Sequence, residues 1–273
     1  MRSRMLLVVA MAVAFVACSL TTSLDGLTGG AEGGAVEGGS VESGADGPIA
    51  DGDGGPSGGD AAEGGPTDPC AGAVLCDRFE RDVPDGIWTS IYTDNGGTVT
   101  IDPTTSTSGT RSLALFVPAA GAPHAQLMSP DYPNVAHARI SWSMKSGPPN
   151  RGVSLMRLQI DENGRASVID VFMFDGRFAM DENVFGMPSA GYADYDLLSG
   201  FKTDMWQRWT LELDARGATA VGIVTLDGVE RLRTNLKNTY AQGALKILVG
   251  AFYAPDGLAQ TLHYDDIAVT ILP

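Results

Sequence analysis

Two carboxylates, Glu212 and Asp214, stand two residues apart in a stretch that alternates apolar and polar residues. Side chains at positions i and i+2 of a β-strand point to the same face, so both acids would lie side by side. Hydrolysis of a glycosidic bond uses two carboxyl groups, one to protonate the leaving oxygen and one to act as nucleophile or base. This pair is therefore the first candidate for enzymatic chemistry, and a weak one, because a proton donor has still to be found.

A second polar and aromatic group lies in residues 181–200, which we expect to form a long loop. The predicted ligand-binding residues are Tyr192, Asp194, Tyr195 and Asp196. A flat ring can stack on the face of a sugar, and carboxylates accept hydrogen bonds from hydroxyl groups. The alternative is that the tyrosines only pack the loop down and the acids keep it soluble.

Other reaction classes find little support. The three histidines, His124, His137 and His263, are scattered and have no recognisable catalytic spacing. A polysaccharide lyase would need a Tyr or His base beside groups that neutralise a uronate carboxylate, and only isolated tyrosines such as Tyr253 are present. No G-x-S-x-G, P-loop or H-E-x-x-H motif occurs, which argues against nucleophilic, phosphoryl-transfer and zinc-protease chemistry.

The beginning of the chain is typical of an export signal. Arg2 and Arg4 precede an apolar run that is too short to span a bilayer and ends at Phe15-Val16-Ala17-Cys18. This ending resembles a bacterial lipoprotein signal, which implies cleavage after residue 17 and lipidation of Cys18. Ordinary cleavage near Ala17 is the alternative. We expect an exported protein anchored to a bacterial membrane, and Ser19 favours the outer membrane or cell surface.

The remaining two cysteines, Cys70 and Cys76, are predicted to form a small-loop disulfide, because an exported chain enters an oxidising compartment. Such a loop would stabilise the fold by roughly 2 kcal/mol. A zinc site is disfavoured, since two thiols without nearby histidines leave the ion under-coordinated.

Residues 18–69 form a Gly-rich acidic segment. Residues 19–69 contain sixteen glycines and ten acidic side chains, with no Lys, Arg or His. Such a composition cannot bury enough apolar area to offset its backbone entropy, so we expect a disordered linker. The net charge of the whole chain is −15, which argues against a nucleic-acid partner.

From residue 70 to 273 strand patterns recur, and we expect about thirteen strands in a two-sheet antiparallel jelly-roll β-sandwich. Residues 77–80 are predicted as the first edge strand, residues 136–144 as a long half-buried strand, and residues 261–272 as the last strand. The central feature is a hairpin. Trp209, Leu211 and Leu213 alternate with polar residues, and a second strand returns to a turn at Asp227-Gly228.

This hairpin resembles that of laminin-G-like domains in the concanavalin A-like lectin/glucanase superfamily, where a W-x-x-W-x-L-x-L-D strand precedes a strand that ends in DG. The stretch LHYDDIAVTIL, residues 262–272, is similar to the last strand of the superfamily, which pairs beside the first. The resemblance covers most of residues 75–273 and specifies sandwich geometry more than chemistry.

Two expectations about the site come from this resemblance. Laminarinase-type glucanases carry Glu-x-Asp-x-x-Glu on one strand, and here Gly217 stands where the acid/base Glu would be. The motif is incomplete, which argues against an enzyme. Many jelly rolls also hold a calcium ion between the first and last strands, and by resemblance Asp77, Glu80 and Asp265 would supply ligands to a structural calcium, with adjacent Asp266 joining only through a bulge. An acidic edge strand that resists aggregation is the alternative.

The sequence thus predicts a lipid-anchored envelope protein that displays a non-catalytic glycan-binding or adhesive jelly roll, with an extracellular or envelope polysaccharide as its partner. A polysaccharide-degrading enzyme of the same fold, whether glycoside hydrolase or lyase, is the second hypothesis. An envelope protein partner is the third.

Overall fold

The computed structural model describes residues 68–147, 152–162, 164–174, 176–185, 192–199, 202–238, 240, 243–252, 254–255 and 257–273. The predicted signal peptide, Cys18 and the predicted linker up to residue 67 lie outside these residues. The described part of the chain contains sixteen β-strands, and no helix in it is long and apolar enough to cross a membrane. The all-β prediction is confirmed.

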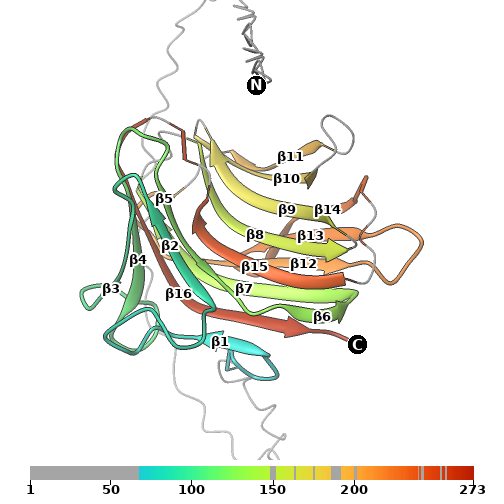
Figure 1. The fold of residues 1–273 in the computed structure, drawn as a ribbon, viewed down its shortest axis with the longest axis horizontal. Coiled ribbons are helices and arrows are strands. Elements are labelled where there is room, and N and C mark those ends of the chain that lie inside the picture. The colour runs from blue at the N-terminus through green and yellow to red at the C-terminus, as the bar shows by residue number, and fades with distance from the viewer. Residues whose placement is uncertain are drawn as a thin grey trace, which may run out of the picture. The chain divides into compact units, whose positions relative to one another are not determined.

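The strands form two antiparallel sheets of eight strands each, here called sheet A and sheet B (Figure 1). Sheet A has the order β14 (Val229–Asn235), β13 (Val221–Leu226), β12 (Gln207–Asp214), β7 (His137–Ser146), β16 (Gln260–Ile271), β4 (Ser112–Val117) and β3 (Thr98–Asp102), and β1 (Leu75–Asp77) also pairs with β16. Sheet B has the order β11 (Ala193–Ser199), β10 (Arg177–Phe185), β9 (Arg165–Phe174), β8 (Val153–Glu162), β15 (Gly243–Ala251), β5 (His124–Met128) and β2 (Ser90–Asp94), and β6 (Tyr132–Val135) also pairs with β15.

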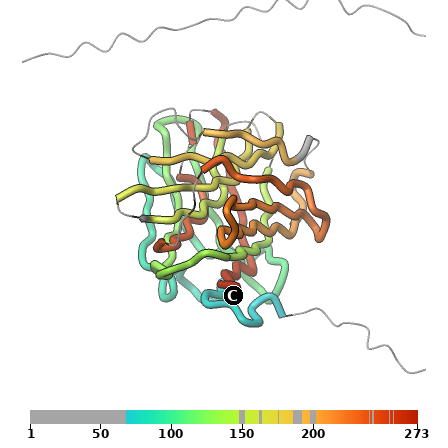
Figure 2. Tube along the Cα trace, turned by 90° about the vertical axis from the view of Figure 1, so that its right-hand side faces the viewer, coloured from blue at the N-terminus to red at the C-terminus, as the bar shows by residue number. Residues whose placement is uncertain are grey.

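The chain crosses between the sheets several times. β7 lies in sheet A and β8 in sheet B, and β15 in sheet B is followed by β16 in sheet A. Figure 2 shows the Cα trace of the same fold, turned by 90° from the view of Figure 1 and coloured along the chain. The result is a jelly-roll sandwich, in which each strand has one face toward the core and one toward solvent.

The predicted central hairpin is present as β12 and β13. Alternation along β12 buries Trp209, Leu211 and Leu213 against the other sheet. The ring of Trp209 stacks on Trp142 of β7 at 6.1 Å and lies 4.8 Å from the ring of Phe178 in sheet B. Because Trp209 contacts both sheets and is 1% exposed, truncating it to Ala would cost about 3–5 kcal/mol.

The first and last strands meet as predicted. β1 pairs antiparallel with β16, with Leu75 opposite Val269. The predicted position of the first strand is wrong by two residues, because the chain leaves the sheet after Asp77 and turns at Phe79, which has a φ of 55°. The disulfide between Cys70 and Cys76 is confirmed and closes the turn that leads into β1.

Candidate functional site

A cavity of about 490 Å³ lies on the outer face of sheet B, the face that points away from the core. Its lining is mainly aromatic and charged. The side chains that matter below are Arg157, Asp170, Phe172, Phe174, Asp181, Asn183, Phe185, Tyr192 and Phe252.

Strand register brings the charged residues of the cavity together. Arg157 on β8 is opposite Asp170 on β9, and Asp170 is opposite Asp181 on β10. Asp181 is in turn opposite Asp194 on β11. Residues directly opposite in an antiparallel pair have Cβ atoms about 5 Å apart, so these four side chains form one row across four strands.

Arg157 and Asp170 form a closed ion pair. The guanidinium donates two hydrogen bonds to the carboxylate, from Nε to Oδ1 and from Nη2 to Oδ2, each 2.6 Å long. The same guanidinium lies over the rings of Phe252, at 4.3 Å, and Phe185, at 4.9 Å. Bidentate pairing and two cation–π contacts together fix Arg157 in one orientation.

Asp181 has no such partner. Its Oδ1 is buried and accepts no hydrogen bond from any described residue. Burial and the neighbouring charge of Asp170 raise the pKa of Asp181 to about 8, although Arg157 opposes this shift. At neutral pH the carboxyl therefore carries a proton, which it can donate to a ligand.

Three aromatic rings at this site remain open to solvent. Tyr192 is 56% exposed, Phe174 47% and Phe185 43%. Large aromatic side chains are usually buried where the fold allows it, and three in one cavity form a surface suited to stacking on a flat ligand.

The structure changes the prediction for residues 181–200. The expected long loop is wrong, since β10 extends to Phe185 and β11 begins at Ala193. The alternation of apolar and polar residues that marks a strand is broken in β10 by Glu182. This acid lies on the core side and is fully buried, at a position where an apolar residue is expected.

Of the four predicted ligand-binding residues, Tyr192 precedes β11, and the other three are divided between the two faces of β11. Tyr192 lines the cavity, and Asp194 lies in the charged row beside Arg177, at 3.5 Å. Asp196 shares that face and is paired with the same arginine. Tyr195 points to the other face.

The side chain of Tyr195 contributes to the packing of the fold. Its hydroxyl donates a hydrogen bond of 2.7 Å to Oε1 of Glu182, and the backbone amides of Lys237 and Asn238 donate to the same carboxylate. Burial and the contact with Glu182 raise the pKa of Tyr195 to about 12. This ring packs the edge of the sandwich rather than the cavity.

The weak catalytic candidates Glu212 and Asp214 lie on the outer face of sheet A, the sheet without the aromatic cavity. Glu212 accepts from His137 at 2.9 Å and is paired with Arg139 at 2.7 Å. Burial would raise the pKa of Glu212, but these hydrogen bonds hold it below its usual value. Asp214 is paired with Arg216, whose hydrogen bonds lower its pKa strongly.

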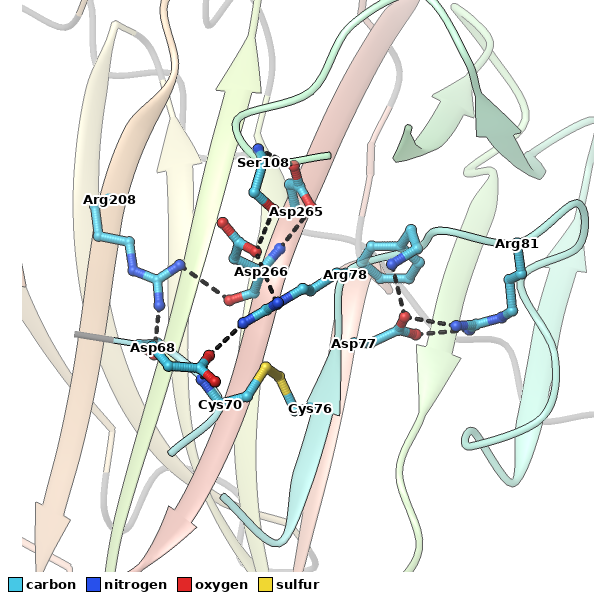
Figure 3. The surroundings of a disulfide bond; sticks show 12 residues. Asp68, Cys70, Cys76, Asp77, Arg78, Arg81, Ser108, Arg208, Asp265 and Asp266 are labelled. Atoms are coloured by element: carbon cyan, nitrogen blue, oxygen red, sulfur yellow. Dashed lines mark hydrogen bonds and ion pairs between the residues drawn. A yellow bond between two sulfur atoms is a disulfide. The ribbon is translucent and has the colours of Figure 1, made fainter. Parts of the chain in front are cut away.

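The predicted calcium ligands are not brought together as one site. Asp77 accepts two hydrogen bonds of 2.6 Å from Arg81 (Figure 3). It also accepts one of 2.7 Å from the indole of Trp88. Glu80 accepts from Thr110 and from the backbone amide of Arg111. Among the residues the structure describes, no three His, Cys, Asp or Glu side chains are placed to hold a metal ion.

The acidic pair in β16 is held by a loop instead. A bulge interrupts the pairing of β16 with β7 between Asp265 and Ala268, and Asp266 has a φ of 49°. Both carboxylates consequently accept hydrogen bonds from Thr107 and Ser108 (Figure 3). The bulge that would let Asp265 and Asp266 face the same site is therefore present. Backbone amides and hydroxyl groups of the loop contact the two carboxylates there.

Sequence reasoning missed most of the cavity. Arg157 is on β8, Asp170 and Phe174 are on β9, Phe185 ends β10 and Phe252 follows β15. Only the pairing of these strands places the five residues side by side. One sequence feature could have indicated the cavity: each of two consecutive, mainly apolar strands carries a charged residue at an outward position. These residues are Arg157 and Asp170.

The sandwich has the concanavalin A-like jelly-roll fold, and solved structures with the same fold resemble it. The endo-β-1,4-glucuronan lyase of the fungus Trichoderma reesei is 14% identical, with a TM-score of 0.56, over 73% of this chain and 96% of that one. The cellulose-induced protein Cip1 is 15% identical, with a TM-score of 0.51, over 72% of this chain and 97% of that one.

A glycoside hydrolase family 16 endo-glucanase from Bacteroides ovatus is 14% identical, with a TM-score of 0.51, over 71% of this chain and 99% of that one. No protein-family model matches the chain, and no curated protein matches it either. At these identities the likeness shows the fold.

Proposed function

We propose that this chain displays a glycan-binding module, with the outer face of sheet B as its binding surface. The observation that carries the proposal is the aromatic cavity, in which Phe174, Phe185 and Tyr192 expose their rings beside polar groups. Sugar rings stack on aromatic faces, and their hydroxyl groups need donors and acceptors such as Asp181 and Asn183.

The fold supports a carbohydrate ligand at the level of its class. A glucuronan lyase and an endo-glucanase that act on polysaccharides have the same sandwich. We extend only this general class of ligand to the present chain.

The test is a glycan array on the purified protein, read together with a screen for released sugar products. We expect saturable binding without product. Changing Tyr192 to Ala should weaken binding about tenfold, which corresponds to about 1.4 kcal/mol. Changing Glu212 to Gln on sheet A should leave binding unchanged, and an equal loss in both variants would contradict the location.

The second candidate is a polysaccharide-degrading enzyme, and Asp181 is the observation in its favour. A carboxyl group that keeps its proton to about pH 8 can protonate a leaving oxygen. Release of reducing-end or unsaturated sugars that is lost in Asp181→Asn would establish this candidate in place of simple binding.

The proposal also includes display outside the cell on a lipid attached to Cys18. The lipoprotein-like ending of the apolar run and the acidic Gly-rich segment after it support this. Changing Cys18 to Ala should move the protein from the membrane fraction to the soluble fraction, and an unchanged distribution would contradict the anchor.

A further inference from the structure

The charges that line the cavity are not balanced. The positive charge of Arg157 is matched by Asp170 through two hydrogen bonds of 2.6 Å. Asp181 is the additional acid in the lining, and the other arginine of this face, Arg177, is directed to Asp194 and Asp196 on β11. Among the lining residues that the structure describes, ionised Asp181 therefore leaves one negative charge more than there are positive charges.

The excess charge lies at an unfilled hydrogen-bonding position. Oδ1 of Asp181 is buried and has no partner among the described residues. A buried carboxylate oxygen without a donor costs free energy, and the carboxyl avoids part of that cost by holding a proton. A ligand that brings its own positive charge would remove the same penalty.

The aromatic rings of the cavity favour a cation as well. The protein already holds one there, since the guanidinium of Arg157 lies over Phe185 at 4.9 Å and over Phe252 at 4.3 Å. Tyr192 and Phe172 also line the cavity. The faces of such rings carry partial negative charge and attract ammonium groups.

We infer that the cavity takes an amino sugar whose amine is free and positively charged, with Asp181 as the anionic partner of the ammonium group. This inference rests on the proposed glycan-binding function and names the class of sugar. Uronic acids and sulfated sugars bring no positive charge to pair with Asp181, and their negative charge would oppose its ionisation, so they are disfavoured. The net charge of −15 of the chain would also speed the encounter with a polycationic glycan.

Binding of the cation should displace a proton. Asp181 faces Asp170 and Asp194 from the neighbouring strands, together with Arg157, and Glu182 adjoins it on its own strand. Burial and the three neighbouring acids keep its carboxyl protonated below about pH 8, against the opposing charge of Arg157. When the ammonium group arrives, the carboxyl loses its proton to solvent and accepts an N–H hydrogen bond instead. Affinity for a cation whose charge does not titrate, such as choline, should therefore rise as pH approaches that value.

The experiment is isothermal titration calorimetry on the full chain with two matched pairs of probes. The first pair is a glucosamine oligosaccharide and its N-acetylated counterpart. The second pair is choline, whose charge does not titrate, and the neutral alcohol in which a tert-butyl group replaces its trimethylammonium group. We expect each cation to bind about tenfold more tightly than its neutral partner. Choline binding should release a proton, seen as a buffer-dependent heat.

Two variants locate the effect. Asp181→Asn keeps the size of the side chain, and it should abolish the preference for the cation in both pairs. Asp196→Asn removes an acid from the same face that is already paired with Arg177, so it should preserve the preference. Proton release in the unchanged protein gives a second measurement that does not depend on how either variant folds.

The outcomes separate this inference from the proposed function. Equal affinity for the two oligosaccharides, unchanged in Asp181→Asn, would overturn the cation inference and leave glycan binding intact. Choline binding that needs Asp181, without binding of any sugar, would support the cation site and overturn the glycan-binding proposal. Absence of binding by every probe would overturn both.

Discussion

The two outer faces of the sandwich treat their charged side chains differently. On sheet A, Glu212 is paired with both His137 and Arg139, and Asp214 is paired with Arg216. On sheet B, Asp181 has a buried oxygen that accepts no hydrogen bond from the part of the chain that the structure describes, and it lies beside rings that are exposed to solvent. A face whose charges are satisfied internally has little to offer a ligand, which is why we propose sheet B as the binding face.

The largest expected effect comes from breaking the ion pair on sheet B. Arg157→Met would leave Asp170, which is 6% exposed, as an unpaired buried carboxylate, and we expect a loss of about 3–5 kcal/mol in the free energy of unfolding. The matched change on sheet A, Arg139→Met, removes a half-exposed side chain from a carboxylate that keeps His137, and it should cost less than about 1 kcal/mol. Urea denaturation of both variants measures the difference, and similar losses would remove the contrast.

The next effect depends on pH. The pKa of Asp181 is raised from 3.8 to about 8, so between these values the folded protein holds a proton that the unfolded chain has lost. This contribution to stability is complete below about pH 4 and is lost as pH rises through 8.

Replacing Asp181 with Asn should therefore raise the melting temperature above pH 8 and change little at pH 4. The full pKa difference would correspond to about 6 kcal/mol, and because the side chain is partly exposed we expect about 2 kcal/mol, or about 4–8 °C. Differential scanning calorimetry across this range is the measurement. An increase of the same size at both ends would show that Asp181 does not titrate in this window.

Aromatic exposure gives a third, smaller contrast. Phe174→Ala on sheet B should weaken glycan binding about five- to tenfold through the loss of one stacking surface. Phe116 on β4 of sheet A is an exposed phenylalanine of similar kind, at 37%, and its change to Ala should have no effect. If both variants bind less well, the binding surface extends beyond sheet B.

The smallest effect is expected from Glu212→Gln. The lowered pKa of Glu212 means that its ion pairs stabilise the fold above its usual pKa, and that this contribution is lost as pH falls through the lowered value. The network is partly exposed, so we expect less than about 1 kcal/mol at neutral pH. Chemical denaturation at pH 7 and in acid tests the sign.

The fold could be predicted because its signals are local. Trp209, Leu211 and Leu213 alternate within one strand, and the Asp227-Gly228 turn follows the next strand, so the hairpin can be inferred without the rest of the chain. The disulfide could be predicted from two nearby cysteines and the expectation that the chain is exported to an oxidising compartment.

The site could be predicted only in part, because it depends on register. Tyr192 and Asp194 were identified by their chemistry, but nothing local places Asp181 beside Asp170 or Arg157. Tyr195 has the same chemistry as Tyr192, and its neighbour Glu182 concealed the strand alternation that sends it to the other face. Residue type predicted the kind of ligand, whereas strand pairing determined which residues can reach it.

The disulfide has a mechanical consequence for a protein held by its N-terminal side. Cys76 lies within β1, and its sulfur bond to Cys70 bypasses the turn between them. A pulling force applied upstream of Cys70 would reach β1 directly, without first unravelling that turn. The load would then be carried by the three β1–β16 residue pairs, at Leu75, Cys76 and Asp77, and passed through β16 into the interior of sheet A.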